Sequence, residues 1–241
     1  MLGGGANLYP AWMIHLFESG STLLDGLVSY WALEETSGTR YDSVGDNDLT
    51  DNNTVGYAAG KHNNAASFVA ANSEYLNFAS PVIPANSDFT VAHWQYLAAD
   101  EAATGMLSWK TNGALQNDQH GIFFEPNNSG NHRMYVRRGY GPGIELGDNR
   151  GAWILVVYEY VHATTTTRLM GLGTAANHGV WTADSVAAVG NNNAFDIGGP
   201  DATIYMNGRI DEMAIWNRVL TDDERTELYA AGAGKFYPFT A

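Results

Sequence analysis

An acidic loop rich in amides carries the residue types best suited to bind a cation. Residues 42–48 read Asp-Ser-Val-Gly-Asp-Asn-Asp. Calcium takes about six to eight oxygen ligands from carboxylates, amides and backbone carbonyls, and a glycine lets a short loop wrap its carbonyls around the ion. We therefore predict a Ca²⁺ site formed by Asp42, Asn47, Asp48 and, from far along the chain, Asp211. The alternative is that these side chains only bond to the backbone of their own turns.

The acidic residues do not form the pattern that glycoside hydrolysis requires. A retaining glycosidase needs two carboxylates about 5 Å apart, which alternate residues of one strand can supply. Here the acids occur as neighbours, as in Glu34-Glu35 and Asp211-Glu212. Because neighbouring residues on a strand point to opposite faces, such pairs are not expected to converge on one bond. We predict that the chain is not an enzyme.

Other catalytic and metal motifs are missing from the sequence. No serine lies in a G-x-S-x-G elbow, and no glycine-rich phosphate loop is followed by Lys and Ser or Thr. The seven histidines are scattered, without an H-E-x-x-H pair or an acidic partner at ligand spacing along the chain. Zinc chemistry is therefore not predicted.

Three aromatic residues in polar loops could bind a sugar. The apolar face of a sugar ring stacks on an aromatic ring while its hydroxyls seek amides and carboxylates. Trp109 lies close to Asn112, Tyr140 lies in a glycine-rich loop, and Trp181 follows His178. We predict these three as ligand-binding residues, with the alternative that each caps the hydrophobic core.

These residues must be positioned by many short strands. Runs rich in Val, Ile, Tyr, Phe and Trp recur between clusters of Gly, Asn, Asp and Pro, which is typical of antiparallel strands joined by turns. The predicted fold is all-β, with two packed antiparallel sheets. The predicted strands are Leu27–Leu33, Ala65–Phe68, Tyr75–Phe78, Phe89–Leu97, Met106–Lys110, Gly121–Glu125, Arg133–Arg137, Trp153–Val161, Thr166–Leu172, Ala194–Ile197 and Gly208–Asn217.

One short helix is predicted near the C-terminus. Thr221 and, three residues later, Glu224 form a capping box, and Asp222 and Asp223 suit the positive first turn. Gly232 is placed to end this helix.

Composition limits the partners. The 241 residues carry a net charge of −14, which disfavours nucleic acid and anionic membranes. There is no cysteine, so disulfides and thiolate metal sites are excluded. Neither a secretory signal nor an apolar run of membrane-spanning length is evident in the sequence. We expect neither nucleic acid nor membrane as a partner.

The N-terminal segment differs from the rest of the chain. We divide the chain into an arm, residues 1–25, and one domain, residues 26–241. The arm begins with glycines and then carries six large apolar residues, which in water would form an exposed apolar patch. We predict that they dock the protein onto another subunit: Tyr9, Trp12, Met13, Ile14, Leu16 and Phe17.

Both ends of the domain carry segments with a distinctive pattern. The opening segment, GLVSYWALEETSGTRYDSVGDNDLT, has an aromatic strand, an E-x-S-G-T turn and a D-S-x-G-x-N loop. The closing segment is FDIGG followed by GRIDEMAIWNRVL. The two segments resemble the first and last strands of laminin-G-like and concanavalin A-like jelly rolls. The resemblance covers about Leu27 to Tyr229 and implies a jelly-roll sandwich whose first and last strands lie side by side. Similar jelly rolls also hold calcium at the corner where Asp42 lies.

This architecture hosts lectins, hydrolases, adhesion modules and virion proteins, so function must be argued separately. Our first hypothesis is a non-enzymatic bacteriophage virion protein, such as a capsid decoration, fibre or tail component, that docks on other virion proteins or its own copies and displays a domain for cell-surface glycans. Its localisation would then be the virion. The alternative is a secreted, calcium-dependent carbohydrate-binding module or lectin.

Overall fold

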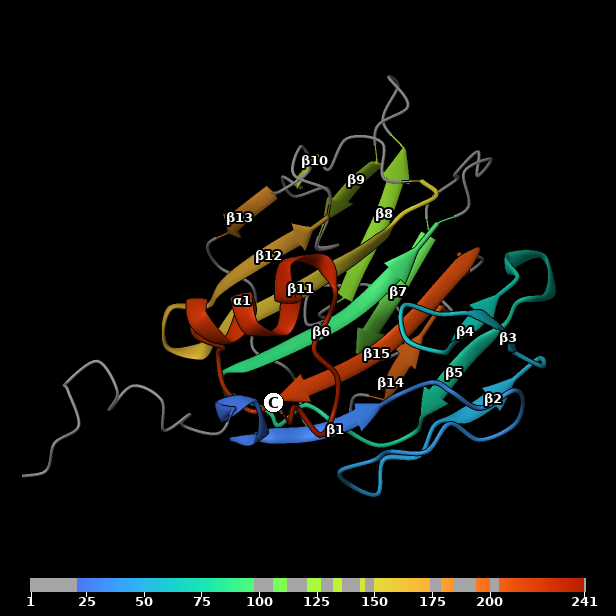
Figure 1. The fold of residues 1–241 in the computed structure, drawn as a ribbon, viewed down its shortest axis with the longest axis horizontal. Coiled ribbons are helices and arrows are strands. Elements are labelled where there is room, and N and C mark those ends of the chain that lie inside the picture. The colour runs from blue at the N-terminus through green and yellow to red at the C-terminus, as the bar shows by residue number, and fades with distance from the viewer. Residues whose placement is uncertain are drawn as a thin grey trace, which may run out of the picture.

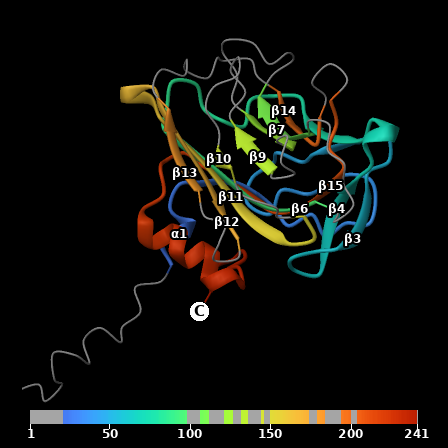
Figure 2. The ribbon, with the colours of Figure 1, turned by 90° about the horizontal axis from the view of Figure 1, so that it is seen from above.

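The computed structural model describes residues 21–97, 106–111, 121–126, 132–135, 144–145, 150–173, 179–183, 194–199 and 204–240. These residues form two antiparallel sheets packed face to face, with one short α-helix near the C-terminus. Figure 1 looks onto the face of the first sheet with the second sheet behind it, and Figure 2, turned by 90°, shows the two layers from the side. The predicted all-β sandwich is confirmed.

The first sheet has the strand order β13-β12-β11-β6-β15-β4-β3, and β1 also pairs with β15. Its longest strands, at the centre, are almost entirely buried because both of their faces are covered. The strands are β1 (Leu27–Trp31), β3 (Gly56–Ala59), β4 (Asn64–Phe68), β6 (Phe89–Tyr96), β11 (Trp153–Val161), β12 (Thr166–Leu172), β13 (Gly179–Ala183) and β15 (Gly208–Trp216).

The second sheet has the strand order β10-β9-β8-β7-β14-β5-β2. Its strands are shorter than those at the centre of the first sheet. They are β2 (Thr50–Asn52), β5 (Tyr75–Phe78), β7 (Met106–Thr111), β8 (Gly121–Pro126), β9 (His132–Tyr135), β10 (Ile144–Glu145) and β14 (Phe195–Ile197).

All eleven predicted strands are present, within two residues at each end. The sequence patterns missed β2, β3, β10 and β13. All four lie at the end of the strand order of their sheet, and β2, β3 and β10 have few large apolar residues, so alternation of apolar and polar residues is weak there. The predicted neighbouring position of the first and last strands is confirmed, since β1 pairs with β15 over Leu27–Trp31.

The core lies between the two sheets. Aromatic rings from both layers stack there: Trp109 of β7 lies between Phe195 of β14 (centroids 5.6 Å apart) and Tyr158 of β11 (5.2 Å). Phe195 also stacks on Trp31 of β1 at 5.7 Å. These rings are fully buried, so they bind the two sheets together through apolar burial and aromatic contact.

A second apolar layer covers the outer face of the first sheet. The helix α1 (Asp222–Tyr229) and the C-terminal tail lie on this face, where Leu228 and Phe239 pack with Trp94 and Trp216. In Figure 1, α1 lies in front of β11 and β6. The predicted capping box is confirmed, but the helix ends at Tyr229, because Ala230 adopts the left-handed conformation (φ 45°) two residues before Gly232.

Residues 21–25 pack on the sandwich, which differs from the predicted boundary at residue 26. They contain the short 3-10 helix η2 (Thr22–Leu24), and Leu23 is fully buried in the layer under α1. The Leu23 carbonyl accepts the indole N–H of Trp216 at 2.7 Å. The folded unit therefore includes residue 21 onward, whereas residues 1–20 lie outside the described part.

Candidate functional site

A β-bulge in the last strand places two neighbouring acids beside the same loop. The pairing of β15 with β6 shifts register between Asp211 and Ala214, and Glu212 has a positive φ of 51°. Asp211 Oδ2 accepts the backbone N–H of His62 at 3.0 Å, and Glu212 Oε1 lies 3.2 Å from His62 Nδ1. The expectation that Asp211 and Glu212 point to opposite faces is therefore wrong, because the bulge breaks the alternation of the strand.

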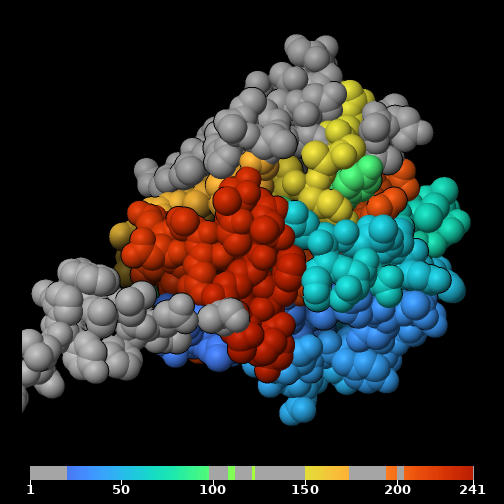
Figure 3. All heavy atoms as spheres, in the orientation of Figure 1, coloured from blue at the N-terminus to red at the C-terminus, as the bar shows by residue number. Residues whose placement is uncertain are grey.

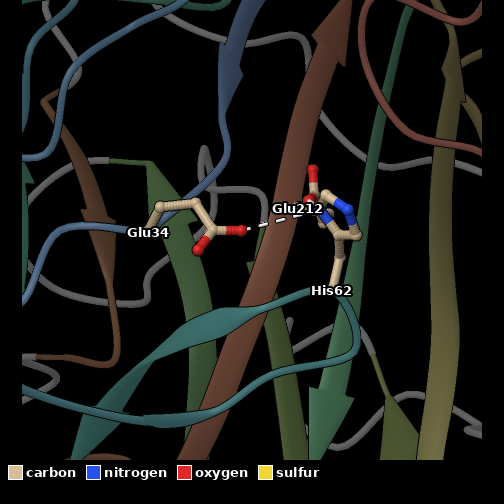
Figure 4. Close-up of side chains that lie close together, drawn as sticks. All are labelled: Glu34, His62 and Glu212. Atoms are coloured by element: carbon tan, nitrogen blue, oxygen red, sulfur yellow. Dashed lines mark hydrogen bonds and ion pairs between the residues drawn. The ribbon is translucent and has the colours of Figure 1, made fainter.

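Three side chains from distant parts of the chain meet at this bulge (Figure 4). Glu34 follows β1, His62 lies in the turn between β3 and β4, and Glu212 lies on β15. His62 Nδ1 lies 3.6 Å from Glu34 Oε1 and 3.2 Å from Glu212 Oε1. One ligand atom from each of the three residues lies within 4.8 Å of the other two. Among the described residues, no other set of three or more His, Asp or Glu side chains is as close together.

The cluster combines exposed and buried groups. The side chains of His62 and Glu34 are 48% and 32% exposed, whereas that of Glu212 is 3% exposed. Burial raises the pKa of Glu212 to about 8. Burial also raises the pKa of Asp211 to about 7, against the opposing effect of the His62 and Lys61 N–H groups, and the negative charge of Glu34 adds to the rise.

Neighbouring groups hold each side chain of the cluster in place. Tyr30 Oη donates to Glu212 Oε2 and accepts the N–H of Tyr237 at 3.0 Å. Glu34 Oε2 accepts the N–H of Asn64 at 2.9 Å. The His62 ring stacks on Phe236, with centroids 4.7 Å apart. These contacts fix the ring and both carboxylates before any ligand arrives.

The C-terminal tail forms one wall of this region. Figure 3 shows the C-terminal residues spread over the outer face, next to the segment that contains the β3–β4 turn. The Lys61 ammonium bonds the carbonyl of Gly232 and lies 4.5 Å from the centroid of Trp94. The tail therefore packs against the turn that presents His62.

The predicted calcium ligands fall into two places. Asp42 Oδ1 accepts the N–H groups of Tyr30 (2.9 Å) and Val44 (3.0 Å), and Asp48 Oδ1 accepts the N–H of Asp42 (2.9 Å). Asn47 donates from Nδ2 to Ser29 Oγ at 2.7 Å. These bonds hold the loop against β1, as expected of turn residues. Asp211 instead bonds the β3–β4 turn, so calcium at these four residues stays a prediction.

The prediction that Trp109 binds a sugar is wrong. Trp109 is fully buried between Phe195 and Tyr158, so its ring is not available to a ligand, and the alternative of a core residue holds. Tyr140 lies outside the described residues, and so does the side chain of Trp181, whose backbone lies in β13. The six docking residues of the arm, from Tyr9 to Phe17, also lie outside them.

The outer face of the second sheet carries a polar row that the sequence reading did not select. Asn77 of β5, Asp196 of β14 and Lys110 of β7 are directly paired across three strands. They face away from the core, because Leu76, Phe195 and Trp109 beside them point into it. Asn77 bonds Asp196, and Lys110 Nζ lies 3.4 Å from the Asp196 carboxylate. The row therefore places a buried ion pair and an amide on the outer face of the second sheet.

Two tyrosines flank this row. Tyr75 lies on the same face as Asn77, two residues earlier, and is half-buried. Its ring lies 6.4 Å from that of Tyr205, and burial together with the nearby Asp196 raises the pKa of Tyr75. Asn52 of β2 pairs with Tyr75. We call Asn52, Tyr75, Asn77 and Tyr205 the tyrosine surface.

In the described part of the chain, no helix is long and apolar enough to cross a membrane.

A family model described as the concanavalin A-like lectin/glucanases superfamily matches residues 70–224, which is more than half of the chain. The chain therefore belongs to this family, in agreement with its two-sheet fold. No curated protein matches the sequence.

Solved structures share the fold at low identity. Domain 4 of an extracellular arabinanase from Geobacillus stearothermophilus, in complex with arabinotriose, is 20% identical with a TM-score of 0.60, over 83% of this chain and 97% of that one. A tailspike protein of an Escherichia coli bacteriophage is 9% identical with a TM-score of 0.61, over 86% of this chain and 28% of that one. The receptor binding domain of botulinum neurotoxin D is 12% identical with a TM-score of 0.59, over 86% and 53%.

Proposed function

We propose that this chain is a non-enzymatic glycan-binding domain of a bacteriophage virion protein, and that the tyrosine surface contacts the sugar. The observation that carries the proposal is the combination of two partly exposed tyrosine rings with two amides on one sheet face. Sugar rings stack on aromatic faces, and amides bond hydroxyl groups. Asp196 on the neighbouring strand, which is paired with Lys110, accepts a hydrogen bond from Asn77 and so holds its side chain in place.

The charges near the tyrosine surface support binding without hydrolysis. Hydrolysis requires two carboxylates on opposite sides of the scissile bond. The polar row holds one carboxylate, Asp196, and it is paired with Lys110. At the other acidic cluster, Glu34 and Glu212 approach each other closely, but Glu212 is buried against Tyr30 and His62, which leaves no room for a sugar between them.

The virion part of the proposal is supported by the arm and by the likeness of fold to the bacteriophage tailspike. The six large apolar residues between Tyr9 and Phe17 precede a sandwich whose own outer layer is already covered by α1 and the tail. Such a segment is suited to dock on a neighbouring subunit. The arabinanase domain, solved with arabinotriose, has the same fold.

The experiment is a glycan array probed with the full chain, followed by affinity measurements on the glycans that bind. Tyr75→Ala and Tyr205→Ala should each weaken binding at least about tenfold, because each removes a stacking platform at the contact. Tyr57→Ala is the matched control, since Tyr57 is 54% exposed on β3 of the other sheet. No reducing sugar should be released from any bound glycan.

Equal binding by all three variants, or no glycan bound by the full chain, would contradict the proposed surface. Release of reducing ends by the full chain would contradict the non-enzymatic assignment.

A further inference from the structure

The cluster of Glu34, His62 and Glu212 lies on the first sheet, away from the tyrosine surface, and the proposed glycan binding does not use it. It combines one imidazole nitrogen with carboxylate oxygens, a ligand set that first-row transition metals prefer to calcium. Ligand atoms held at about 2.0–2.2 Å from a tetrahedral zinc ion are roughly 3.3 Å apart. The observed separations of 3.2 and 3.6 Å from His62 Nδ1 to the two carboxylates match this spacing.

A buried carboxylate oxygen near the cluster has no hydrogen-bond partner. Asp211 is fully buried, and its Oδ2 accepts the N–H groups of Lys61 (2.7 Å) and His62 (3.0 Å). Its Oδ1 is buried without any hydrogen-bond partner. A buried, unsatisfied carboxylate oxygen costs folding free energy, and the positive charge of an ion held by the three nearby ligands would offset part of that cost.

The surroundings suit a metal centre. The outer oxygens of both glutamates are held by Tyr30 and by the N–H of Asn64, and stacking on Phe236 orients the imidazole ring. Such contacts hold metal ligands in position and tune their basicity. The half-exposed side chain of His62 gives an ion access from solvent, whereas Glu212 and Asp211 form a buried floor.

We propose that Glu34, His62 and Glu212 form a binding site for one divalent transition-metal ion of the zinc class, with the buried Asp211 carboxylate nearby as an additional negative charge. The ion would link three separate parts of the sandwich: the segment after β1, the β3–β4 turn and the bulge of β15. Because it would bind only the folded chain, it would stabilise the fold by mass action.

The test uses the full chain, treated with a chelator and then dialysed, with ZnCl₂ alone as the probe. Calorimetric titration should show one zinc ion per chain, and the melting temperature should rise with zinc. His62→Ala and Glu34→Gln, both at partly exposed positions, should raise the Kd for zinc at least about tenfold, as expected for loss of a ligand. His162→Ala is the matched control, and circular dichroism verifies that each variant is folded.

Zinc binding that is absent, or that is unchanged in His62→Ala, would overturn the proposal. A parallel titration with CaCl₂ separates this site from the predicted calcium loop. Calcium binding that depends on His62 in the absence of zinc binding would overturn the assignment of the metal class. Calcium binding that is lost only in Asp42→Asn and Asp48→Asn would instead support the predicted calcium loop. The zinc site would then be tested separately by the His62 and Glu34 variants.

Discussion

His93 on β6 shows how burial decides the chemistry of a single residue. It points into the core between the sheets, is fully buried, and its Nε2 lies 3.3 Å from Oε1 of Gln95. Burial lowers its pKa to about 4, although the contact with Gln95 acts in the opposite direction. The folded protein therefore holds this imidazole neutral at pH values where an exposed histidine would be protonated.

This difference predicts an acid-sensitive contribution to stability. Between pH 6.5 and about 4, the unfolded chain binds a proton at His93 that the folded chain does not bind, so the free energy of unfolding falls as the pH is lowered through this range. The loss from this group is at most about 3 kcal/mol.

The prediction can be checked by urea unfolding of the wild type and His93→Gln at several pH values. The difference in unfolding free energy between the two proteins should be constant above pH 7 and should shrink steadily from pH 6.5 towards 4, because only the wild type loses this contribution. A difference that does not change with pH would contradict the argument.

At the scale of elements, the short helix α1 is stabilised by its N-terminal cap and by ion pairs, among them Arg218–Glu224 and Arg225–Glu159. The helix has eight residues, from Asp222 to Tyr229, and so short a helix is marginal by itself. Thr221 Oγ1 accepts the N–H of Glu224 at 3.2 Å, and the Glu224 side chain accepts the N–H of Thr221 at 2.8 Å. Arg218 binds both oxygens of Glu224 at 2.7 Å, and this pairing lowers the pKa of Glu224 to about 2.

We predict that Thr221→Ala lowers the free energy of unfolding by about 1 kcal/mol, because it removes the cap of a helix that covers the apolar outer face of the first sheet. Thermal unfolding or urea unfolding at neutral pH measures the change. Thr226→Ala is the control: it replaces an exposed threonine in the same helix by a better helix former and should not destabilise the protein. Equal loss in both variants would show that the cap itself contributes nothing.

For the whole molecule, the described residues between Ser21 and Thr240 form one folded unit. Its two sheets enclose one core, and η2, α1 and the C-terminal tail cover the outer face of the first sheet. Leu23, Trp216 and Arg218 tie the start of this unit to its end, since Trp216 and Arg218 both donate to backbone carbonyls of residues 22–25. Residues 21–25 of the arm therefore belong to the folded unit, which leaves residues 1–20 as the segment to remove in a test of docking.

We predict that a chain lacking residues 1–20 folds with nearly the wild-type melting temperature but no longer assembles or attaches to particles. Circular dichroism and thermal melting test the fold, and sedimentation or light scattering tests assembly. A deletion of residues 1–25 is the informative comparison, because it also removes the buried Leu23 and should destabilise the sandwich. If the shorter deletion unfolds while the intact chain is monomeric, the arm belongs to the core of its own domain.

The sequence by itself determined the class of fold and most of the strands. Strands are predicted from the alternation of apolar and polar residues, and turns and helix caps from patterns that extend over three or four residues. Both kinds of signal lie within a short segment of the sequence, so they need no knowledge of the tertiary structure. The paired ends of the chain, Leu27–Trp31 and Gly208–Trp216, and the capping box at Thr221 are examples that the structure confirms. Edge strands such as β3 were missed because their apolar and polar residues do not alternate clearly.

Only the tertiary structure decided which residues meet. Glu34, His62 and Glu212 are far apart in the chain, and they converge because β1 and β4 both pair with β15, and because a bulge turns Glu212 towards the loop that Asp211 already binds. Trp109 belongs to the core because its neighbours in β14 and β11 close around it. Register, bulges and burial depend on contacts between distant segments, and periodicity within one segment carries no information about them.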